Sequence, residues 1–181
     1  IVGGRFGIDP AVTTPLTELV ELTGAIYRDD IGVICLPTSH PQNASGDRKV
    51  ILEADLIFGI DCRDLSSMLD SYTEQKTEVG SGRARPGRKV IDMSLNEMAP
   101  SSWSYLRGPQ ALVDVQINCD PILGMQHLTL KLKERLANDP NAREQVEARR
   151  RIASERHISI RAQQQACAKI GWTDRPIRPD R

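Results

Sequence analysis

The sequence predicts an α/β fold: a three-layer parallel sheet with helices on both faces, followed by a helical linker at the C-terminus. Two observations carry this prediction. Short apolar runs alternate with helix-like patterns along the chain, as expected for strands joined by crossover helices. The run at residues 56–60 (LIFGI) is apolar throughout, which indicates a strand buried on both faces, as in a parallel sheet. The expected architecture is therefore Rossmann-like.

Composition limits the classes of function that fit this chain. Its 181 residues fit one domain, and a hydrophobic content of 39% with only 4% aromatic residues predicts an aliphatic core. The 24 basic and 24 acidic side chains cancel, which disfavours partners such as nucleic acid or an anionic membrane. Four scattered cysteines without a CxxC pair predict no metal site and are typical of thiols in a cytoplasmic protein. The sequence contains no signal peptide and no apolar run of membrane-spanning length.

The first part of the chain is expected to hold two strands around one helix. Residues 1–2 predict a strand, and Gly3 and Gly4 predict a tight turn after it. Asp9 and Pro10 are suited to begin a helix, because Asp caps a first turn and Pro needs no N–H there. The apolar positions of this helix are Leu16, Leu19, Val20 and Leu22.

Gly24 is expected to end this helix, residues 25–27 to form the second strand, and residues 29–48 to form a polar loop. Later elements are expected at 50–54 (helix or turn), 56–60 (strand), 64–72 (helix), 89–93 (strand), 111–117 (strand) and from Pro121 to about Ala137 (helix). The last of these helices has a predicted buried stripe of Ile122, Leu123, Leu128, Leu130 and Leu132. Residues 141–170 are charged and helical in pattern, which indicates a connector.

The candidate site consists of the residues that follow strands, because ligands of open α/β sheets bind at the carboxyl ends of the strands. Gly3 and Gly4 could bring backbone N–H groups close to a phosphate, or could serve only as a turn. Asp92 and Asp120 are expected to end neighbouring strands, where a carboxylate can bind a ribose or an adenine edge. Asp120 is equally suited to cap the helix that follows it.

Other polar residues have two interpretations each. His40 could be a general base, but no carboxylate lies near it in sequence, and packing of its loop is the favoured role. Arg83, Arg85 and Arg88 could hold an anion, although a solvated loop is favoured, and residues 149–151 (RRR) are interpreted as a solvated helix face. The sequence shows no Ser/His/Asp grouping, carboxylate pair or metal-ligand spacing, so neither catalytic residues nor metal ligands are predicted.

Several segments occur in an order that resembles the central (middle) domain of thiamine-diphosphate-dependent enzymes, the group that includes acetolactate synthase and benzoylformate decarboxylase. These segments are 16–25 (LTELVELTGA), 36–41 (LPTSHP), 50–58 (VILEADLIF), 90–93 (VIDM) and 117–120 (INCD). The resemblance spans residues 1–138. It implies that residues 139–181 form a charged helical linker toward a missing cofactor-binding domain. Because the chain opens inside a strand, the sequence is interpreted as a fragment.

The resemblance implies a structural domain without catalytic residues, inactive as an isolated chain. The parent enzyme would be a transferase or lyase that forms or cleaves a C–C bond, and its other domains would bind thiamine diphosphate and Mg²⁺. FAD or ADP would contact Gly3, Gly4, Asp92 and Asp120 of this domain. The implied partners are neighbouring domains of the same chain and identical subunits in a dimer or tetramer.

Two alternatives stay open at this point. One is a free-standing Rossmann-type module that binds FAD, ADP or NAD, against which the glycine spacing counts. The other is an interaction domain without any ligand.

Overall fold

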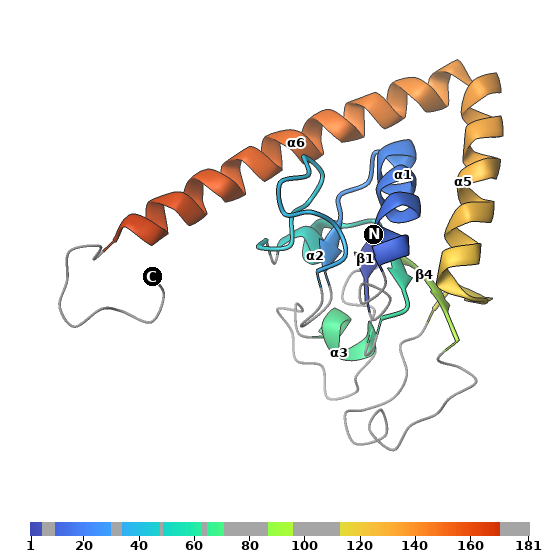
Figure 1. Ribbon diagram of the computed structural model, residues 1–181, viewed down its shortest axis with the longest axis horizontal. Coiled ribbons are helices and arrows are strands. Elements are labelled where there is room, and N and C mark those ends of the chain that lie inside the picture. Colours follow the sequence, from blue (N-terminus) through green and yellow to red (C-terminus); the bar gives the residue numbers. More distant parts are fainter. Residues whose placement is uncertain are drawn as a thin grey trace.

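The computed structural model describes residues 1–4, 10–29, 34–47, 49–62, 65–70, 87–95 and 113–170. Within these residues, five strands form one sheet in which all neighbours are parallel: β1 (Val2–Gly3), β2 (Arg28–Asp29), β3 (Leu56–Ile60), β4 (Lys89–Ser94) and β5 (Val115–Asn118). The helices are α1 (Thr13–Thr23), α2 (Lys49–Glu53), α3 (Leu65–Asp70), α5 (Pro121–Asn138) and α6 (Pro140–Lys169), and a 3₁₀ turn, η2, spans Pro10–Val12. The predicted α/β class is confirmed (Figure 1).

The strand order is β2-β1-β3-β4-β5. The chain therefore leaves β1 toward one side of the sheet to form β2, and later continues on the other side of β1 with β3. Such a reversal is a topological switch point, and the carboxyl ends of the two strands beside it are the usual ligand site of this architecture. Here the switch point lies between Gly4, which follows β1, and Asp61, which follows β3.

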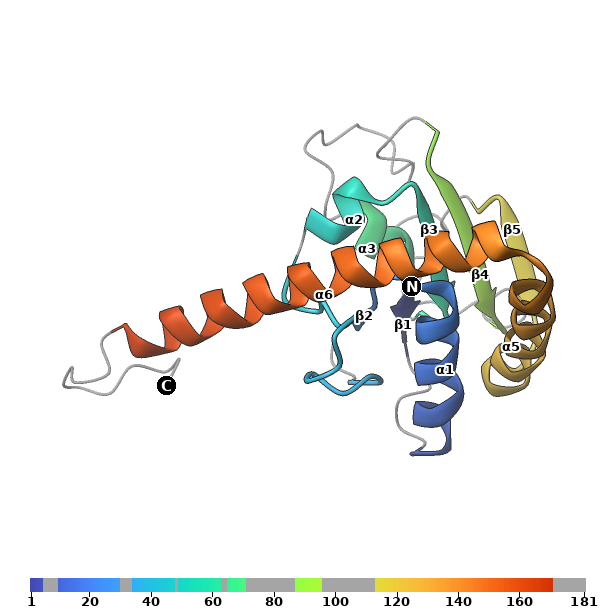
Figure 2. The same ribbon diagram turned by 90° about the horizontal axis from the view of Figure 1, so that it is seen from above.

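Helices cover both faces of the sheet, as predicted. Figure 2 shows α1 and α5 on one side and α2 and α3 on the other. The helices α1 and α5 pack on Ile60 and Met93 of the sheet. The helices α2 and α3 pack on Ile57 and Val90, on the opposite face. Because side chains alternate along a strand, one strand such as β3 contributes to both layers, which explains its apolar sequence.

Local signals explain where several helices begin and end. Gly24 has a φ of 65°, the left-handed conformation that glycine adopts at low cost, and it ends α1 as predicted. Asp120 caps α5, since its Oδ1 accepts the backbone N–H groups of Ile122 (2.9 Å) and Leu123 (3.0 Å). Asp139 caps α6 in the same way, by accepting the N–H of Ala142 at 3.0 Å.

The helix α6 lies across the rest of the molecule and its last turns project past the sheet in both views (Figures 1 and 2). A helix at 141–170 was predicted, and α6 confirms it. Only Val146 and Ala153 of α6 are fully buried, whereas Ile152 and Ile158 are exposed. The helix is therefore attached to the domain mainly by polar contacts.

The predictions for the first part of the chain are wrong in two places. A strand was expected at residues 25–27, but β2 begins at Arg28, because Tyr27 forms an isolated bridge with Asn43 and its carbonyl accepts the N–H of Ala44. Pro10 begins the 3₁₀ turn rather than the first turn of α1. Asp9, the predicted cap, lies outside the described residues.

The predicted buried stripe of α5 is also partly wrong. Leu123 and Leu130 are both 57% exposed, and the fully buried positions of the helix are Met125 and Thr129. Leu123 and Leu130 are seven residues apart and share one helix face, and that face points away from α1 and the sheet. The other three predicted positions, Ile122, Leu128 and Leu132, are partly buried and pack against the core as expected.

Candidate functional site

The two glycines at the switch point are required by close packing. A Cβ on Gly3 would overlap the Tyr27 hydroxyl, and one on Gly4 would overlap the carbonyl oxygen of Asp61. Gly3 lies inside β1, and the N–H of Gly4 donates to the carbonyl of Ile60 at 3.0 Å. The backbone N–H of Gly4 is thus part of the sheet, and the described structure supports a packing role for both glycines more directly than a phosphate cradle.

A polar cluster missed in the sequence lies at the end of β2. The Asp29 carboxylate accepts three hydrogen bonds, from the Tyr27 hydroxyl, the Cys35 backbone N–H and the Ser45 hydroxyl, each at 2.9 Å. The Cys35 thiol donates to the carbonyl of Gly4 at 3.2 Å. These contacts attach residues 35 and 45 of the loop to the ends of β1 and β2.

Burial, and next the negative charge of Asp29, raise the pKa of the Tyr27 hydroxyl well above its ordinary value of 10.0. The phenol therefore stays protonated and acts as a hydrogen-bond donor. Sequence patterns gave no signal for this cluster, because its members come together only through the tertiary fold.

Asp92 does not end its strand, and this prediction is wrong. It is the fourth of six residues of β4, which continues to Ser94. Its side chain points to the face covered by α2 and α3, two positions after Val90. It is only 8% exposed, and its Oδ2 accepts the hydroxyl of Ser94 at 2.8 Å and the amide of Gln116 at 3.1 Å.

The second oxygen of this carboxylate is unusual. Asp92 Oδ1 is buried and has no hydrogen-bond partner among the described residues. Buried carboxylate oxygens rarely lack a donor, since desolvation without compensation is costly. Asp92, Ser94, Gln116 and Asn118 form a row of polar side chains along β4 and β5, in which the Gln116 amide also donates to Asn118 at 3.3 Å. We call these four residues the Asp92 row.

Asp120 follows β5, as predicted, and its structural role as a helix cap is the one observed. Gly4 and Asp120 follow β1 and β5, which are three strand spacings apart, or about 14 Å. The four predicted contacts for FAD or ADP are therefore not gathered at one point. Two pack at the switch point, one is buried within β4, and one caps α5.

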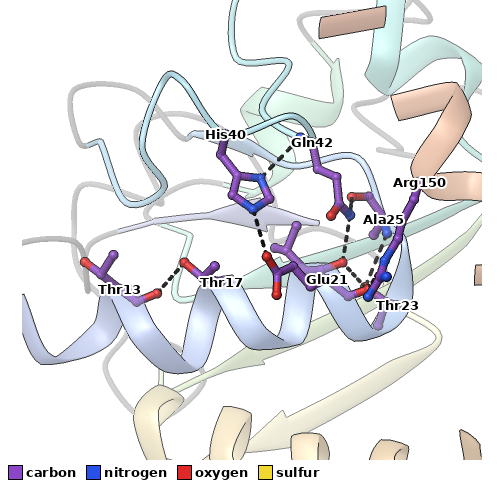
Figure 3. Close-up of polar contacts among 9 residues, drawn as sticks. Thr13, Thr17, Glu21, Thr23, Ala25, His40, Gln42 and Arg150 are labelled. Atoms are coloured by element: carbon purple, nitrogen blue, oxygen red, sulfur yellow. Dashed lines mark hydrogen bonds and ion pairs between the residues drawn. The ribbon is translucent and has the colours of Figure 1, made fainter. Parts of the chain in front are cut away.

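His40 contacts a carboxylate that lies 19 positions earlier in the sequence. Its Nε2 lies 3.5 Å from the Glu21 carboxylate on α1, and its Nδ1 accepts the backbone N–H of Gln42 at 3.2 Å. Figure 3 shows the ring between these two partners. Both ring nitrogens therefore face polar groups of the domain itself, and this geometry supports the packing role more directly than that of a general base. The side-chain amide of Gln42 also attaches this loop to the end of α1, since it donates to the carbonyls of Val20 and Ala25, each at 2.8 Å.

Several arginines hold the carboxyl-terminal ends of helices. Arg88, expected on a solvated loop, is only 4% exposed and donates to the carbonyls of Ile51 (2.6 Å) and Leu52 (3.0 Å) at the end of α2. Arg149 and Arg150 of α6, expected on a solvated face, donate to carbonyls of the last turn of α1. The prediction for Arg88 is wrong, because the last carbonyls of a helix lack intrahelical partners and attract cations. On α6, Arg149 and Arg151 are exposed as expected, and the contacts with α1 add a capping role to this face. Arg83 and Arg85 lie outside the described residues.

The described residues include no group of three or more His, Cys, Asp or Glu side chains that could hold a metal ion. They also include no helix with the length and apolarity needed to cross a membrane.

No protein-family model, curated protein or solved structure matches this chain.

Proposed function

We propose that this chain is a non-catalytic α/β domain of a larger thiamine-diphosphate-dependent enzyme, of the acetolactate synthase or 2-oxo acid decarboxylase type. One observation carries the proposal: the polar groups near the carboxyl ends of the described strands hold the domain's own loops and helices. Asp29 fixes the 35–45 loop, Asp120 caps α5, and both ring nitrogens of His40 are engaged. Such a domain is suited to hold neighbours that supply the reactive groups.

The order of the elements supports the same proposal. The segments that resemble the central domain fall on α1, on the α2–β3 unit, on β4 and on the junction of β5 with α5. In this proposal, neighbouring domains of the same parent chain bind thiamine diphosphate and Mg²⁺. The parent is a cytoplasmic dimer or tetramer, and α6 is the linker toward the next domain.

Calorimetric titration of the isolated chain with thiamine diphosphate and Mg²⁺ tests this proposal. We expect no binding, because the diphosphate site would be formed by other domains. Binding at micromolar strength to the folded chain would contradict the proposal. A circular dichroism spectrum before and after the titration verifies that the chain is folded.

The Asp92 row favours a second candidate, a free-standing Rossmann-type module for FAD, ADP or NAD. A ribose hydroxyl is a hydrogen-bond donor that could satisfy the buried Oδ1 of Asp92. The test is the melting temperature with and without ADP, FAD or NAD. If this candidate holds, a nucleotide raises the melting temperature by several degrees, Asp92→Asn removes the increase, and Asp120→Asn retains it because Asn also caps helices.

A further inference from the structure

A cavity of about 590 Å³ lies at the amino-terminal edge of the sheet, opposite the edge discussed above. Its floor includes Val2 and Leu56, the first residues of β1 and β3, and α6 forms its outer wall with Val146 and Ile152. The volume falls within the range of about 300–1,000 Å³ that is typical of small-molecule sites. None of the residues proposed above to contact a nucleotide lines it.

The walls of this cavity are largely apolar. Leu22, Leu56, Leu132, Leu136 and Ile152 line it from α1, β3, α5 and α6. Leu56 in the floor and Ile152 in the outer wall are 50% and 59% exposed, respectively. An apolar group placed between them would remove both side chains from water, which is favourable in proportion to the apolar area buried.

The charged groups of the cavity are mostly positive. Its lining includes four arginines and only two carboxylates, Glu53 and Asp55. Arg156 pairs with Glu53, and Arg149 donates to the carbonyl of Thr23. Arg135, in the last turn of α5, makes no hydrogen bond or ion pair within the described part of the chain. A guanidinium beside apolar walls is suited to pair with a carboxylate.

We propose that this cavity binds a small molecule with an apolar chain and one anionic group, such as a medium-chain carboxylate. The chain lies between Leu56 and Ile152, and the carboxylate pairs with Arg135. This site is independent of the proposed function, since it uses the opposite edge of the sheet and none of the polar side chains that carry the proposed function.

Calorimetric titration with octanoate, octan-1-ol and octylammonium tests the charge requirement. We expect octanoate to bind with a submillimolar Kd, and the other two compounds, which have the same chain, to bind at least tenfold more weakly. Equal affinity for octanoate and octan-1-ol, or no binding of octanoate at millimolar concentration, would overturn the proposal.

Variants locate the site. Arg135→Gln should weaken octanoate binding about tenfold without changing the affinity for octan-1-ol, because only the ion pair is lost. Arg151→Gln is the matched control, since Arg151 is exposed on α6 and does not line the cavity. Leu56→Trp, which fills the cavity, should abolish octanoate binding, with the melting temperature reporting that the chain still folds. Equal losses in the two arginine variants, or full binding by Leu56→Trp, would place any octanoate site elsewhere and overturn the assignment.

Discussion

At the residue scale, Gly3 and Tyr27 are in such close contact that neither position can change independently of the other. Besides overlapping the Tyr27 hydroxyl, a Cβ on Gly3 would lie 3.0 Å from two carbons of the tyrosine ring. Tyr27 is fully buried and its hydroxyl donates to Asp29, so the ring has little room to withdraw. The absence of a side chain at position 3 is therefore what allows Tyr27 to reach Asp29 and attach the loop.

This coupling gives a first prediction. Gly3→Ala should lower the free energy of unfolding by about 2 kcal/mol through overpacking, and Tyr27→Phe by about 1.5 kcal/mol through loss of the bond to Asp29. The double variant should lose at least about 1 kcal/mol less than the sum, because removing the hydroxyl removes part of the overlap. Urea unfolding of the four proteins measures this coupling. Additive losses would mean that Gly3 and Tyr27 do not share this contact.

Tyr27 also gives a pH prediction. Burial and the charge of Asp29 hold its folded-state pKa above the ordinary 10.0, so above pH 10 the unfolded chain loses this proton while the folded chain retains it. The stabilisation is therefore complete below pH 10 and is lost as the pH rises, by up to about 1.4 kcal/mol per pH unit. Urea unfolding between about pH 9 and 11 should show a steeper loss for the native chain than for Tyr27→Phe. Parallel profiles would contradict the pKa shift.

At the scale of elements, the end of α1 is fitted to α6. Gly24 has a φ of 65°, and a Cβ there would lie 2.5 Å from the carbonyl oxygen of Val146. Gly87 also has a left-handed φ, of 83°, but a Cβ there would meet nothing within 4 Å. A substitution at Gly87 would therefore cost backbone strain alone, whereas the same substitution at Gly24 would also disturb the contact between α1 and α6.

Gly87 serves as the control for Gly24, because it has the left-handed φ without the close contact. Gly87→Ala should lower the free energy of unfolding by about 1 kcal/mol from strain alone, and Gly24→Ala by about 3 kcal/mol because α6 must also move. In a chain shortened to residues 1–139, the loss from Gly24→Ala should fall to that of Gly87→Ala. Denaturant unfolding of each pair checks this. An unchanged loss in the shortened chain would show that α6 does not restrict Gly24.

Elements with strong local signals could be predicted from the sequence, and those set by distant contacts could not. The apolar run of β3 and the cap at Asp120 are local, and both were placed correctly. The position of β2 depends on pairing with β1, and a two-residue strand carries almost no pattern. Arg88 could not be placed either, because its partners at the end of α2 lie more than 30 positions earlier. In the candidate site, the capping role of Asp120 was predicted because it is a local signal, and the packing role of His40 was favoured without its partner Glu21 being identified.

At the scale of the whole molecule, the sheet separates two apolar clusters. One lies between the sheet and α1 and α5, and includes Leu19. The other lies between the sheet and α2 and α3, and includes Leu69. Both leucines are fully buried. Because β3 and β4 contribute side chains to both clusters, the loss of packing on one face should weaken the strands that the other face requires.

The two faces should therefore unfold together. Leu19→Ala and Leu69→Ala should each lower the free energy of unfolding by about 3 kcal/mol, in a single transition with an unchanged denaturant slope. Leu130→Ala is the control, since Leu130 is 57% exposed and its loss should change stability by less than about 0.5 kcal/mol. Urea unfolding followed by circular dichroism gives the slope, and hydrogen exchange of β3 and of α1 reports each face. If Leu69→Ala opened the α3 face while α1 kept its protection, the two layers would be separate folding units. The shared strands would then not couple them.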